Sequence, residues 1–331
     1  MAHKKYRAAL IGCGAIGSKI DEGGNTLGIQ THAAAYQACS RTELVGICDV
    51  DADRVAACAK NRNVVRYYQD HRAMLESCFP DVVSIATATS SHDHILHDVL
   101  DFPGVKLVIC EKPIASNFQI ALDVVRKAEA VGCRLVVNYS RHYLPVMAQV
   151  RNIIGDGKIG AVRLVNGFYT KTLVHNGTHL LDLLFWWFGR MQLVHAEPGS
   201  WAKNSNDFCN VTLKMAGGMP VYLHSLDAKD YSLFEIDIIG SSGRISITHG
   251  GNVVKIWEVE DHMLFAGYRE FAANPRVTEN CLNDLMLTVI ETSLDMLGGD
   301  EDAATRCCMG NDSLAVLKLA EDAVDLAGAR I

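Results

Sequence analysis

The chain has 331 residues, of which 49% are hydrophobic and 21% charged, and its formal net charge is −7. This length predicts two domains, and the composition is typical of a well-packed globular protein rather than a disordered one. No run of Lys or Arg exceeds two residues. This charge pattern argues against nucleic acid and membrane surfaces as partners and favours a small-molecule ligand.

The chain start and the cysteines favour a cytoplasmic protein. Residues 1–7 run straight into a short apolar strand, without the longer apolar segment and cleavage site of a secretory leader. No apolar stretch reaches the length of a membrane span. The eleven cysteines form no CxxC pair, and several lie in apolar strands. We therefore expect buried free thiols and a reducing compartment.

The first 140 residues alternate strands and helices. Continuous apolar runs predict buried strands over 6–12, 43–49, 64–67, 82–87, 106–110 and 134–138. Helices are predicted between them over 52–60, 70–77, 93–100 and 118–130. Repeated strand–helix units with right-handed crossovers predict an α/β fold with a doubly wound parallel sheet, which we assign to residues 1–138.

The pattern changes in the second predicted domain, residues 139–331. Longer strands dominate there, over 161–169, 192–201, 208–215, 220–228, 234–240, 244–248 and 253–259. Ser241-Ser242-Gly243 between two of them predicts a hairpin turn, and therefore a mostly antiparallel sheet. Helices are predicted over 145–154, 178–188, 283–297 and 312–327. Packing of the last helix back on the first domain is left open.

A glycine-rich turn, Gly12-Cys13-Gly14-Ala15-Ile16-Gly17, follows the first strand. This spacing is weak evidence alone, but the position is the one that dinucleotide binding requires. The first glycine permits the tight turn, the second lets the backbone approach a pyrophosphate, and the third allows close packing of helix and strand. We therefore predict cofactor contacts from Gly12, Gly14, Ala15, Ile16 and Gly17, against the alternative of a structural turn.

Asp49 ends the second strand, where a carboxylate can accept hydrogen bonds from the adenosine ribose and repel a 2′-phosphate. This favours NAD over NADP. Asp51 is a second candidate, although helix capping explains it better. Gly17 and Asp49 are 32 positions apart, longer than the ~20 of the simple fingerprint. The excess resembles a loop inserted over Ser18–Gln30, which either covers the cofactor or substrate or has no role.

Three motifs resemble one known family. Glu111-Lys112-Pro113 closes the fifth strand, Thr87-Ala88-Thr89-Ser90-Ser91-His92 follows the fourth, and Ile239–Ile245 forms the predicted hairpin. Together with the glycine turn they resemble the glucose–fructose oxidoreductase / inositol dehydrogenase / MocA family over nearly the whole chain. The resemblance implies a Rossmann domain followed by an open sheet, through which many members form homodimers or homotetramers. It also implies an NAD(P)-dependent oxidoreductase acting on a ring alcohol of a sugar, cyclitol or nucleotide sugar. Cofactor contacts from Thr87, His92, Glu111 and Lys112 follow from it.

The resemblance also assigns catalytic residues. Lys112 matches the family's catalytic lysine, and a strand's carboxyl end is independently where ligands bind in such sheets. The alternative is a surface salt bridge with Glu111. His179 matches the histidine of the family pattern Asp-x-x-x-His-x-x-Asp, and Asp182 completes it, whereas His175 stands where Asp is usual. His175 cannot supply a fixed negative charge, so we expect it to be auxiliary.

Several polar residues are candidate substrate contacts. Asn138 and Arg141 follow the sixth strand, Tyr169 and Lys171 precede the histidine segment, and His175 and His179 complete the set. Interdomain packing is the alternative for the first pair. A metal site built from His92, His94, His97 and the His175/His179 pair is disfavoured, because no spacing matches a compact zinc site. We therefore predict no metal.

Three classes of function remain to be separated. The leading one is an NAD-dependent dehydrogenase or reductase. The second is an NAD-requiring glycosidase or lyase that oxidises its substrate transiently, and the third is a non-enzymatic NAD-binding sensor. Net NADH production distinguishes the first from the second, and the presence of Lys112 and His179 argues against the third.

Overall fold

The computed structural model describes all residues except 1–4, 23, 25–26, 203–204, 206 and 329–331, and it divides into two compact units. Unit 1 contains residues 1–143 and 283–314, and unit 2 contains residues 144–282 and 315–331. The sequence prediction placed a single boundary after residue 138. The structure differs because residues 283–314 return to the first unit.

Unit 1 is built on a six-stranded parallel sheet with the order β3-β2-β1-β4-β5-β6. The strands are β1 (Tyr6–Ile11), β2 (Thr42–Cys48), β3 (Tyr67–Tyr68), β4 (Val82–Ile85), β5 (Leu107–Glu111) and β6 (Arg134–Asn138). The strand order reverses between β1 and β4, the switch point beside which ligands bind in such sheets. The predicted doubly wound fold is confirmed. The third strand was predicted over 64–67, but Val64 packs in the core beside the preceding helix, and only Tyr67 and Tyr68 pair with β2.

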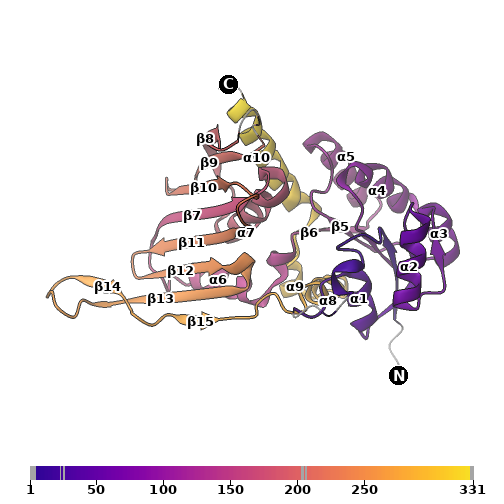
Figure 1. The fold of residues 1–331 in the computed structure, drawn as a ribbon, viewed down its shortest axis with the longest axis horizontal. Coiled ribbons are helices and arrows are strands. Elements are labelled where there is room, and N and C mark those ends of the chain that lie inside the picture. The colour runs from indigo at the N-terminus through magenta and orange to yellow at the C-terminus, as the bar shows by residue number, and fades with distance from the viewer. Residues whose placement is uncertain (1–4, 23, 25–26, 203–204, 206, 329–331) are drawn as a thin grey trace. The chain divides into compact units, whose positions relative to one another are not determined.

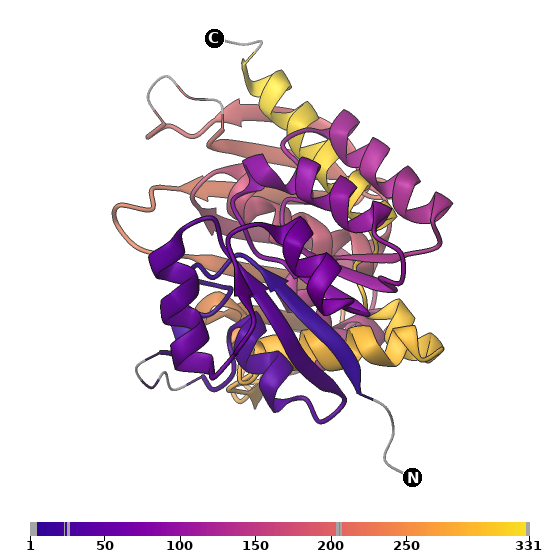
Figure 2. The ribbon, with the colours of Figure 1, turned by 90° about the vertical axis from the view of Figure 1, so that its right-hand side faces the viewer.

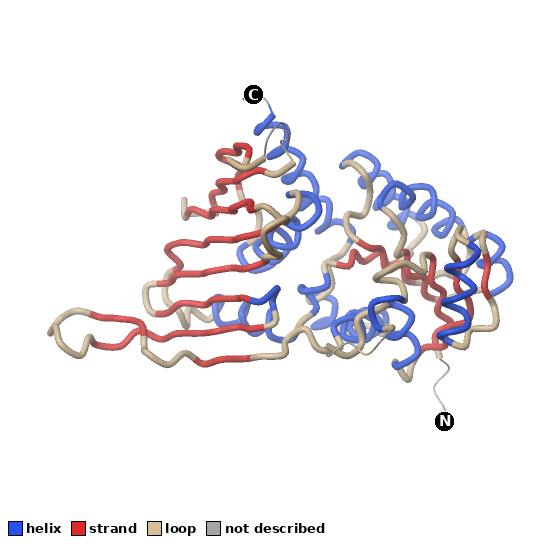
Figure 3. The backbone as a smooth tube through the Cα atoms, viewed as in Figure 1, coloured by secondary structure: helices blue, strands red, loops and turns tan. Residues whose placement is uncertain are grey.

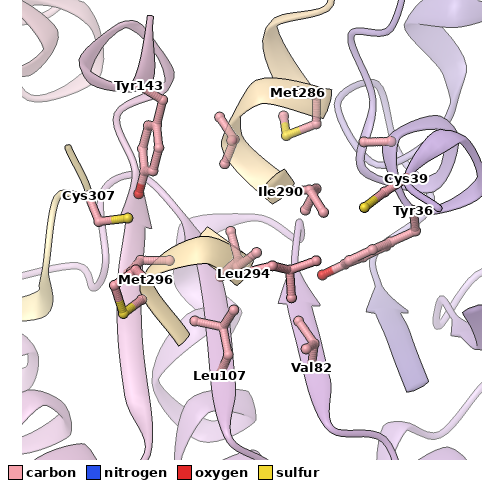
Figure 4. Packing of buried hydrophobic residues seen from close by; sticks show 14 of the residues in the cluster. Tyr36, Cys39, Val82, Leu107, Tyr143, Met286, Ile290, Leu294, Met296 and Cys307 are labelled. Atoms are coloured by element: carbon pink, nitrogen blue, oxygen red, sulfur yellow. The ribbon is translucent and has the colours of Figure 1, made fainter. Parts of the chain in front are cut away.

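Helices cover both faces of this sheet (Figures 1 and 2), with α1 and α8 on one face and α4 and α5 on the other. The helices of unit 1 are α1 (His32–Ala38), α2 (Ala52–Arg62), α3 (His71–Cys78), α4 (His92–Asp101), α5 (Phe118–Ala130), α8 (Leu285–Leu297), α9 (Glu301–Thr305) and the first turn of α10 (Gly310–Gly328). Figure 4 shows why α8 belongs here: Met286, Ile290 and Leu294 pack with Tyr36 and Leu107 in one buried cluster. The apolar stripe of α8 therefore completes the core of unit 1.

Unit 2 is built on a nine-stranded sheet (Figure 3). Among its strand pairs in the described part of the chain, only β7–β10 is parallel. The strand order is β14-β13-β12-β11-β7-β10-β9-β8, with β15 paired to β13. The strands are β7 (Val162–Thr170), β8 (Gln192–Pro198), β9 (Cys209–Lys214), β10 (Pro220–Leu226), β11 (Phe234–Gly240), β12 (Gly243–Thr248), β13 (Val253–Asp261), β14 (Arg269–Phe271) and β15 (Arg276–Thr278). The predicted mostly antiparallel sheet is confirmed, whereas β14 and β15 are too short and polar for the apolar pattern to reveal.

One face of this sheet is packed and the other is open. Along β11 and β12, buried residues alternate with half-buried ones. The packed face meets α6 (Pro145–Gly155) and α7 (Thr178–Phe188). A side chain at Gly167 of β7 would come within 3.0 Å of Leu180 of α7, so glycine allows this close approach.

Two chain-wide predictions can be compared with the described residues. All eleven cysteines are free thiols, and ten of them are buried. Among the helices that the structure describes, none combines the length and apolar character needed to cross a membrane.

Candidate functional site

The glycine turn of unit 1 has the geometry that a dinucleotide site needs. Gly12 has a φ of +101°, and a Cβ there would lie 2.5 Å from the carbonyl oxygen of Ala86. A Cβ at Gly17 would lie 2.1 Å from the carbonyl oxygen of Gly12. At Gly14 a Cβ would meet nothing within 4 Å. Gly12 and Gly17 are therefore required by the protein's own packing, and Gly14 leaves its outer side open to a ligand.

The helix that follows the turn is interrupted and then resumes. The amide of Ser18 donates to the carbonyl of Gly14, which forms a first helical turn. The amides of His32 and Ala33, at the start of α1, then donate to the carbonyls of Ile16 and Gly17 at 3.2 and 3.0 Å. His32 thus occupies the register that residue 20 would hold in a continuous helix. The intervening segment is an insertion after the first turn of the helix that follows the glycine turn, called the cofactor helix below.

This insertion explains the long spacing between Gly17 and Asp49. His32 stands 12 positions beyond register position 20. Subtracting these 12 positions from the 32 between Gly17 and Asp49 leaves 20, the usual separation of about 20. The insertion was predicted over Ser18–Gln30, but residues 18 and 19 still belong to the helical turn.

The insertion is attached at both ends within unit 1. The Asp21 carboxylate accepts hydrogen bonds from the amides of Gln30 and Thr31, each at 2.9 Å. Near the other end, the amide of Ile29 donates to Asp284 at 2.8 Å, and the amide of Asp284 donates to the carbonyl of Leu27 at 2.9 Å. These contacts hold residues 27–29 against the start of α8.

Asp49 lies next to the glycine turn and is 6% exposed. Its carboxylate accepts a hydrogen bond from the amide of Cys13 at 2.8 Å and another from the amide of Asp51 at 3.0 Å. The Arg54 guanidinium lies 3.1 Å from Asp49 and also donates to Asp51 at 3.0 Å. Asp51 caps α2 through the amide of Arg54, as predicted for it. Arg54 is thus engaged by two carboxylates.

A pocket of about 390 Å³ opens at this point, at the carboxyl ends of β1, β2 and β4. Among the predicted cofactor residues, it brings together Gly12, Gly14, Asp49 and Thr87. Sequence reasoning missed several residues that share its lining, including Arg54, Gln69, His71 and His94. The sequence alone does not distinguish these polar residues from ordinary residues on a solvent-exposed surface.

The predicted cofactor residue His92 is fully buried. Its Nδ1 lies 2.9 Å from the carbonyl oxygen of Pro113, and its Nε2 lies 3.1 Å from that of Thr87. The ring therefore connects the loop after β4 to the loop after β5. This placement indicates that His92 supports the two loops, and its cofactor contact stays a prediction.

Glu111, Lys112 and Pro113 follow β5, and the Lys112–Pro113 peptide is cis. Glu111 accepts hydrogen bonds from His32 at 3.1 Å and from Asn138 at 2.6 Å. Both residues thus contact one another within unit 1, and the cofactor contact of Glu111 and the substrate contact of Asn138 stay predictions. Sequence reasoning missed His32, which lies 79 positions from Glu111.

Arg141 lies in a short 3-10 turn, Ser140–Tyr143, directly after β6. Burial lowers the pKa of Arg141 to about 10. A guanidinium with this pKa stays charged near neutrality. Its predicted contact with substrate stays a prediction.

In unit 2 the structure places Tyr169 in the core. Tyr169 is fully buried, and its hydroxyl donates to the carbonyl oxygen of Cys209. Burial raises the pKa of this phenol well above its ordinary value. Tyr169 thus joins β7 to the start of β9 and is not among the residues that line the pocket described below; its substrate contact stays a prediction.

Lys171 and His175 form a pair at the surface of unit 2. Lys171 has a φ of +68°, a left-handed conformation that is uncommon outside glycine and concentrates at functional sites. Its Nζ lies 3.5 Å from Nε2 of His175. His175 lies in a π-helical turn, Leu173–Gly177, whose first residue is preceded by the capping Thr172.

His179 lies in the first turn of α7, which directly continues this π-helical turn. It is 7% exposed, and its ring meets the edge of Phe234 at a centroid distance of 6.3 Å. Asp182 is 3% exposed and follows three residues later, on the same helix face. His179 and His175 thus differ in burial, because His175 is exposed.

A pocket of about 720 Å³ lies beside this pair within unit 2. Lys171, Thr172 and His175 line one part of it, and Trp201, Phe208, Asp227 and Lys229 line the rest. Trp201 donates from its indole nitrogen to the carbonyl of Ser225 at 2.9 Å and meets Phe208 edge-on at 4.8 Å. The pocket thus presents a fixed aromatic wall beside two lysines. Sequence reasoning had assigned the aromatic residues no role.

Residues 6–139 match the model of a family described as an oxidoreductase family with an NAD-binding Rossmann fold. This range holds the glycine turn, Asp49 and the Glu111-Lys112-Pro113 motif. The N-terminal domain belongs to the Gfo/Idh/MocA oxidoreductase family.

Known proteins are similar to this chain in sequence or in fold. The chain is 31% identical to D-apiose dehydrogenase of Paraburkholderia graminis over 157 residues, which cover 47% of this chain and 38% of the relative. An inositol dehydrogenase homologue of Azotobacter vinelandii, solved with NADH and myo-inositol, has a TM-score of 0.78 at 18% identity, over 99% of this chain and 97% of the other. The WlbA dehydrogenase of Bordetella pertussis, solved with NADH and UDP-GlcNAcA, has a TM-score of 0.76 at 20% identity, over 99% and 98%.

The sequence matches and the structural matches cover different parts of the chain. The chain spans about half the length of the curated relatives it matches. The structural likeness extends over both units, and at this identity it shows the fold alone. The Gfo/Idh/MocA assignment therefore rests on the N-terminal domain.

The residues of this Gfo/Idh/MocA domain fit an NAD-type cofactor. Gly14 leaves space where the backbone must approach a pyrophosphate, and the pocket beside it carries the Asp49 carboxylate for a ribose. The first helical turn after Gly14 offers backbone N–H groups to phosphate.

Proposed function

We propose that the protein is an NAD-dependent oxidoreductase that transfers a hydride between nicotinamide and a ring alcohol or ketone of a sugar, cyclitol or nucleotide sugar. The observation that carries this proposal is Lys112 at the carboxyl end of β5 in a Gfo/Idh/MocA domain. The named activities of relatives, D-apiose dehydrogenase and inositol 2-dehydrogenase, support the substrate class.

The chain's own residues bind, orient and move protons. When bound, the cofactor supplies the hydride chemistry. In alcohol oxidation, the Lys112 ammonium donates a hydrogen bond to the reacting oxygen and stabilises the negative charge that develops there. His179 accepts the hydroxyl proton as a neutral imidazole, a role that histidine side chains commonly fill near neutral pH. In the reverse direction His179 returns this proton to the carbonyl oxygen.

NAD is preferred over NADP in this proposal. Asp49 is buried against the glycine turn, and in this proposal its negative charge repels a 2′-phosphate. Arg54, the nearby cation that could bind this phosphate, is already paired with Asp49 and Asp51. Both observations favour the unphosphorylated ribose.

The pocket of unit 2 supports a substrate with more than a sugar ring. Its volume of about 720 Å³ lies in the usual range of about 300–1,000 Å³ for sites that enclose drug-sized ligands. Trp201 offers a face for stacking, and Lys171 and Lys229 offer charge for a polar or anionic substituent. A nucleotide sugar or another glycoside fits this lining better than a free monosaccharide.

We also propose that the protein assembles as a homo-oligomer through the sheet of unit 2. One face of that sheet is only half-buried along β11 and β12. The hairpin between β13 and β14 exposes Met263, Leu264, Phe265 and Tyr268, from 60% to 90% of each side chain. A second copy of the chain is the occupant that the family resemblance supplies.

The test is a substrate screen with two variants. NADH absorbance is followed with NAD and a panel of glycosides, inositols, D-apiose and nucleotide sugars. For any substrate found, Lys112→Ala should lose most turnover and keep its Kd for NAD, whereas Lys158→Ala, an exposed lysine paired with Asp156, should resemble the wild type. Near-normal turnover in Lys112→Ala would remove this residue from the chemistry. Product formation without net NADH would support the transient-oxidation alternative instead.

A further inference from the structure

We propose that His32 and Asn138 are positioning residues for Lys112, because together they hold the Glu111 carboxylate as a fixed anion beside that lysine. The anion stabilises Lys112 as an ammonium and fixes the strand end that carries it. The effect on turnover rests on the proposed function. The charge arrangement itself is a property of unit 1 that can be measured without a substrate.

Three elements converge on one oxygen atom of Glu111. Nε2 of His32, the first residue of α1, lies 3.1 Å from Oε1. Nδ2 of Asn138 donates to the same Oε1 at 2.6 Å. Asn138 is also the register partner of Glu111 across the β5–β6 pair. Hydrogen bonds to an ionised carboxylate are short and strong, so the contacts connect α1, β5 and β6 at the site where Lys112 begins.

The cluster is buried, so the Glu111 carboxylate needs hydrogen bonds to offset its loss of water contacts. His32 is fully buried, Asn138 is 2% exposed, and the Glu111 side chain is 13% exposed. Burial acts to raise the pKa of Glu111, but the hydrogen bonds from His32 and Asn138, with the charges of His32 and Lys112, outweigh it and lower the pKa below its ordinary value. Glu111 is therefore an anion near neutral pH.

The donor roles follow from the geometry. Asn138 presents its amide nitrogen, because its amide oxygen would repel the carboxylate, and His32 must carry a proton on Nε2 to donate. Nδ1 of His32 is buried, and no described residue hydrogen-bonds to it. In the contact with Glu111, His32 therefore acts as the donor through Nε2.

The Glu111 anion acts on Lys112 electrostatically. Lys112 follows Glu111 directly, and its positive charge helps to keep Glu111 ionised. Electrostatic coupling is reciprocal, so the Glu111 anion also favours the charged form of Lys112. The other titratable groups that face Glu111 are His32 and the buried thiol of Cys110, whose pKa is raised by its burial and by the charge of Glu111. Neither supplies a second anion.

The first experiment measures the titration of Lys112 directly. Lysines of the full-length protein are ¹³C-dimethylated, and the Lys112 signal is assigned by its loss in Lys112→Arg. We expect Glu111→Gln to move the Lys112 titration midpoint to lower pH by on the order of 1 unit, as the loss of a neighbouring opposite charge does. His32→Leu should move it in the same direction. His32→Gln, whose amide can still donate to Glu111, should restore the wild-type midpoint.

The control is Tyr36→Phe, which removes another buried hydrogen bond of unit 1, the 2.6 Å contact to Ser84. It should leave the midpoint unchanged. An unchanged midpoint in Glu111→Gln would overturn the proposal, as would equal midpoints in His32→Leu and His32→Gln. If His32→Leu does not fold, as judged by circular dichroism, the pair Asn138→Leu and Glu111→Gln carries the decision in its place.

The second experiment uses any substrate that the screen finds. His32→Leu should lower kcat about 10- to 100-fold, the range that slight misplacement of a reacting group produces, while the KM for NAD changes little. His32→Gln should recover most of the loss. The pH profile of kcat should shift with the Lys112 midpoint in each variant. A kcat loss with an unshifted pH profile would assign His32 a structural role only. A screen without turnover would count against the proposed function and leave the titration result standing.

Discussion

Arg54 determines what happens when Asp49 is removed. Its guanidinium is held by Asp49 and Asp51, so Asp49→Ser removes a negative charge and frees a cation together. We expect weaker binding of NAD and tighter binding of NADP, each by about 10- to 100-fold, because a hydrogen bond to a charged group contributes about 1.5–3 kcal/mol. Fluorescence titration with both cofactors measures the two Kd values.

A double variant separates the two effects. Asp49→Ser with Arg54→Ala should lose the gain toward NADP while keeping the loss for NAD. Wild-type protein that binds NADP more tightly than NAD would show that Asp49 does not approach the ribose.

The two histidines of unit 2 should differ in their effect on turnover. His179 is buried in the first turn of α7, whereas His175 is exposed beside Lys171. Loss of a general acid–base group costs about 10²–10⁴-fold, so His179→Ala should lose that much kcat and His175→Ala clearly less. His175→Asp, which restores the residue usual in the family, should retain activity. An inactive His175→Ala with an active His179→Ala would exchange the two roles.

A single sequence can nominate site residues that belong to a local motif. The glycine turn, Asp49 and Lys112 each follow a strand end, and strand ends are visible as the limit of an apolar run. The contacts of His32 and Tyr169 could not be predicted, for a common reason. Their roles depend on partners 79 and 40 positions away, and a single sequence does not show which side chain the register brings opposite another.

At the scale of elements, two glycines of the turn should serve different purposes: Gly12 is needed for folding, and Gly14 is needed for NAD binding. Gly12→Ala would place a Cβ in a left-handed conformation and 2.5 Å from a backbone oxygen. We expect it to lower stability by more than about 1 kcal/mol. Gly14→Ala meets no neighbouring atom and should unfold like the wild type, yet bind NAD at least about tenfold more weakly because its methyl group occupies the approach to the pyrophosphate.

Thermal unfolding and NAD titration of the two variants measure these effects. Normal NAD affinity in Gly14→Ala would place the pyrophosphate elsewhere. Normal stability in Gly12→Ala would contradict the tight packing of the turn against the end of β4.

Most elements were predicted within a few residues of their observed ends, because parallel strands buried on both faces are continuous apolar runs. Two kinds of element were missed. α1 has only seven residues and is separated from its own first turn by the insertion, so no helical period of useful length exists in the sequence. β14 and β15 have three residues each and are mostly exposed, so their hydrogen bonds to β13 leave no apolar signal.

At the scale of the whole molecule, the exposed hairpin tip predicts self-association. Phe265 and Leu264 are 60% and 78% exposed, and apolar side chains gathered at one exposed place mark interaction sites. We expect Leu264→Asp with Phe265→Asp to reduce the molar mass measured by light scattering after size-exclusion chromatography. Val65→Asp, at a 90% exposed apolar residue of unit 1, should leave that mass unchanged. A wild-type protein that elutes as a monomer would rule out this assembly.

The insertion in the cofactor helix is a place where the chain can be opened experimentally. Hydrogen bonds from His32 to Ile16 and from Ala33 to Gly17 join the two pieces of that helix, and both ends of the insertion are held by Asp21 and Asp284. We therefore expect the two pieces to stay together when the chain is opened between Glu22 and Leu27. New chain termini, or a fused reporter peptide, introduced between these residues should leave the hydrogen-bonded helix in place.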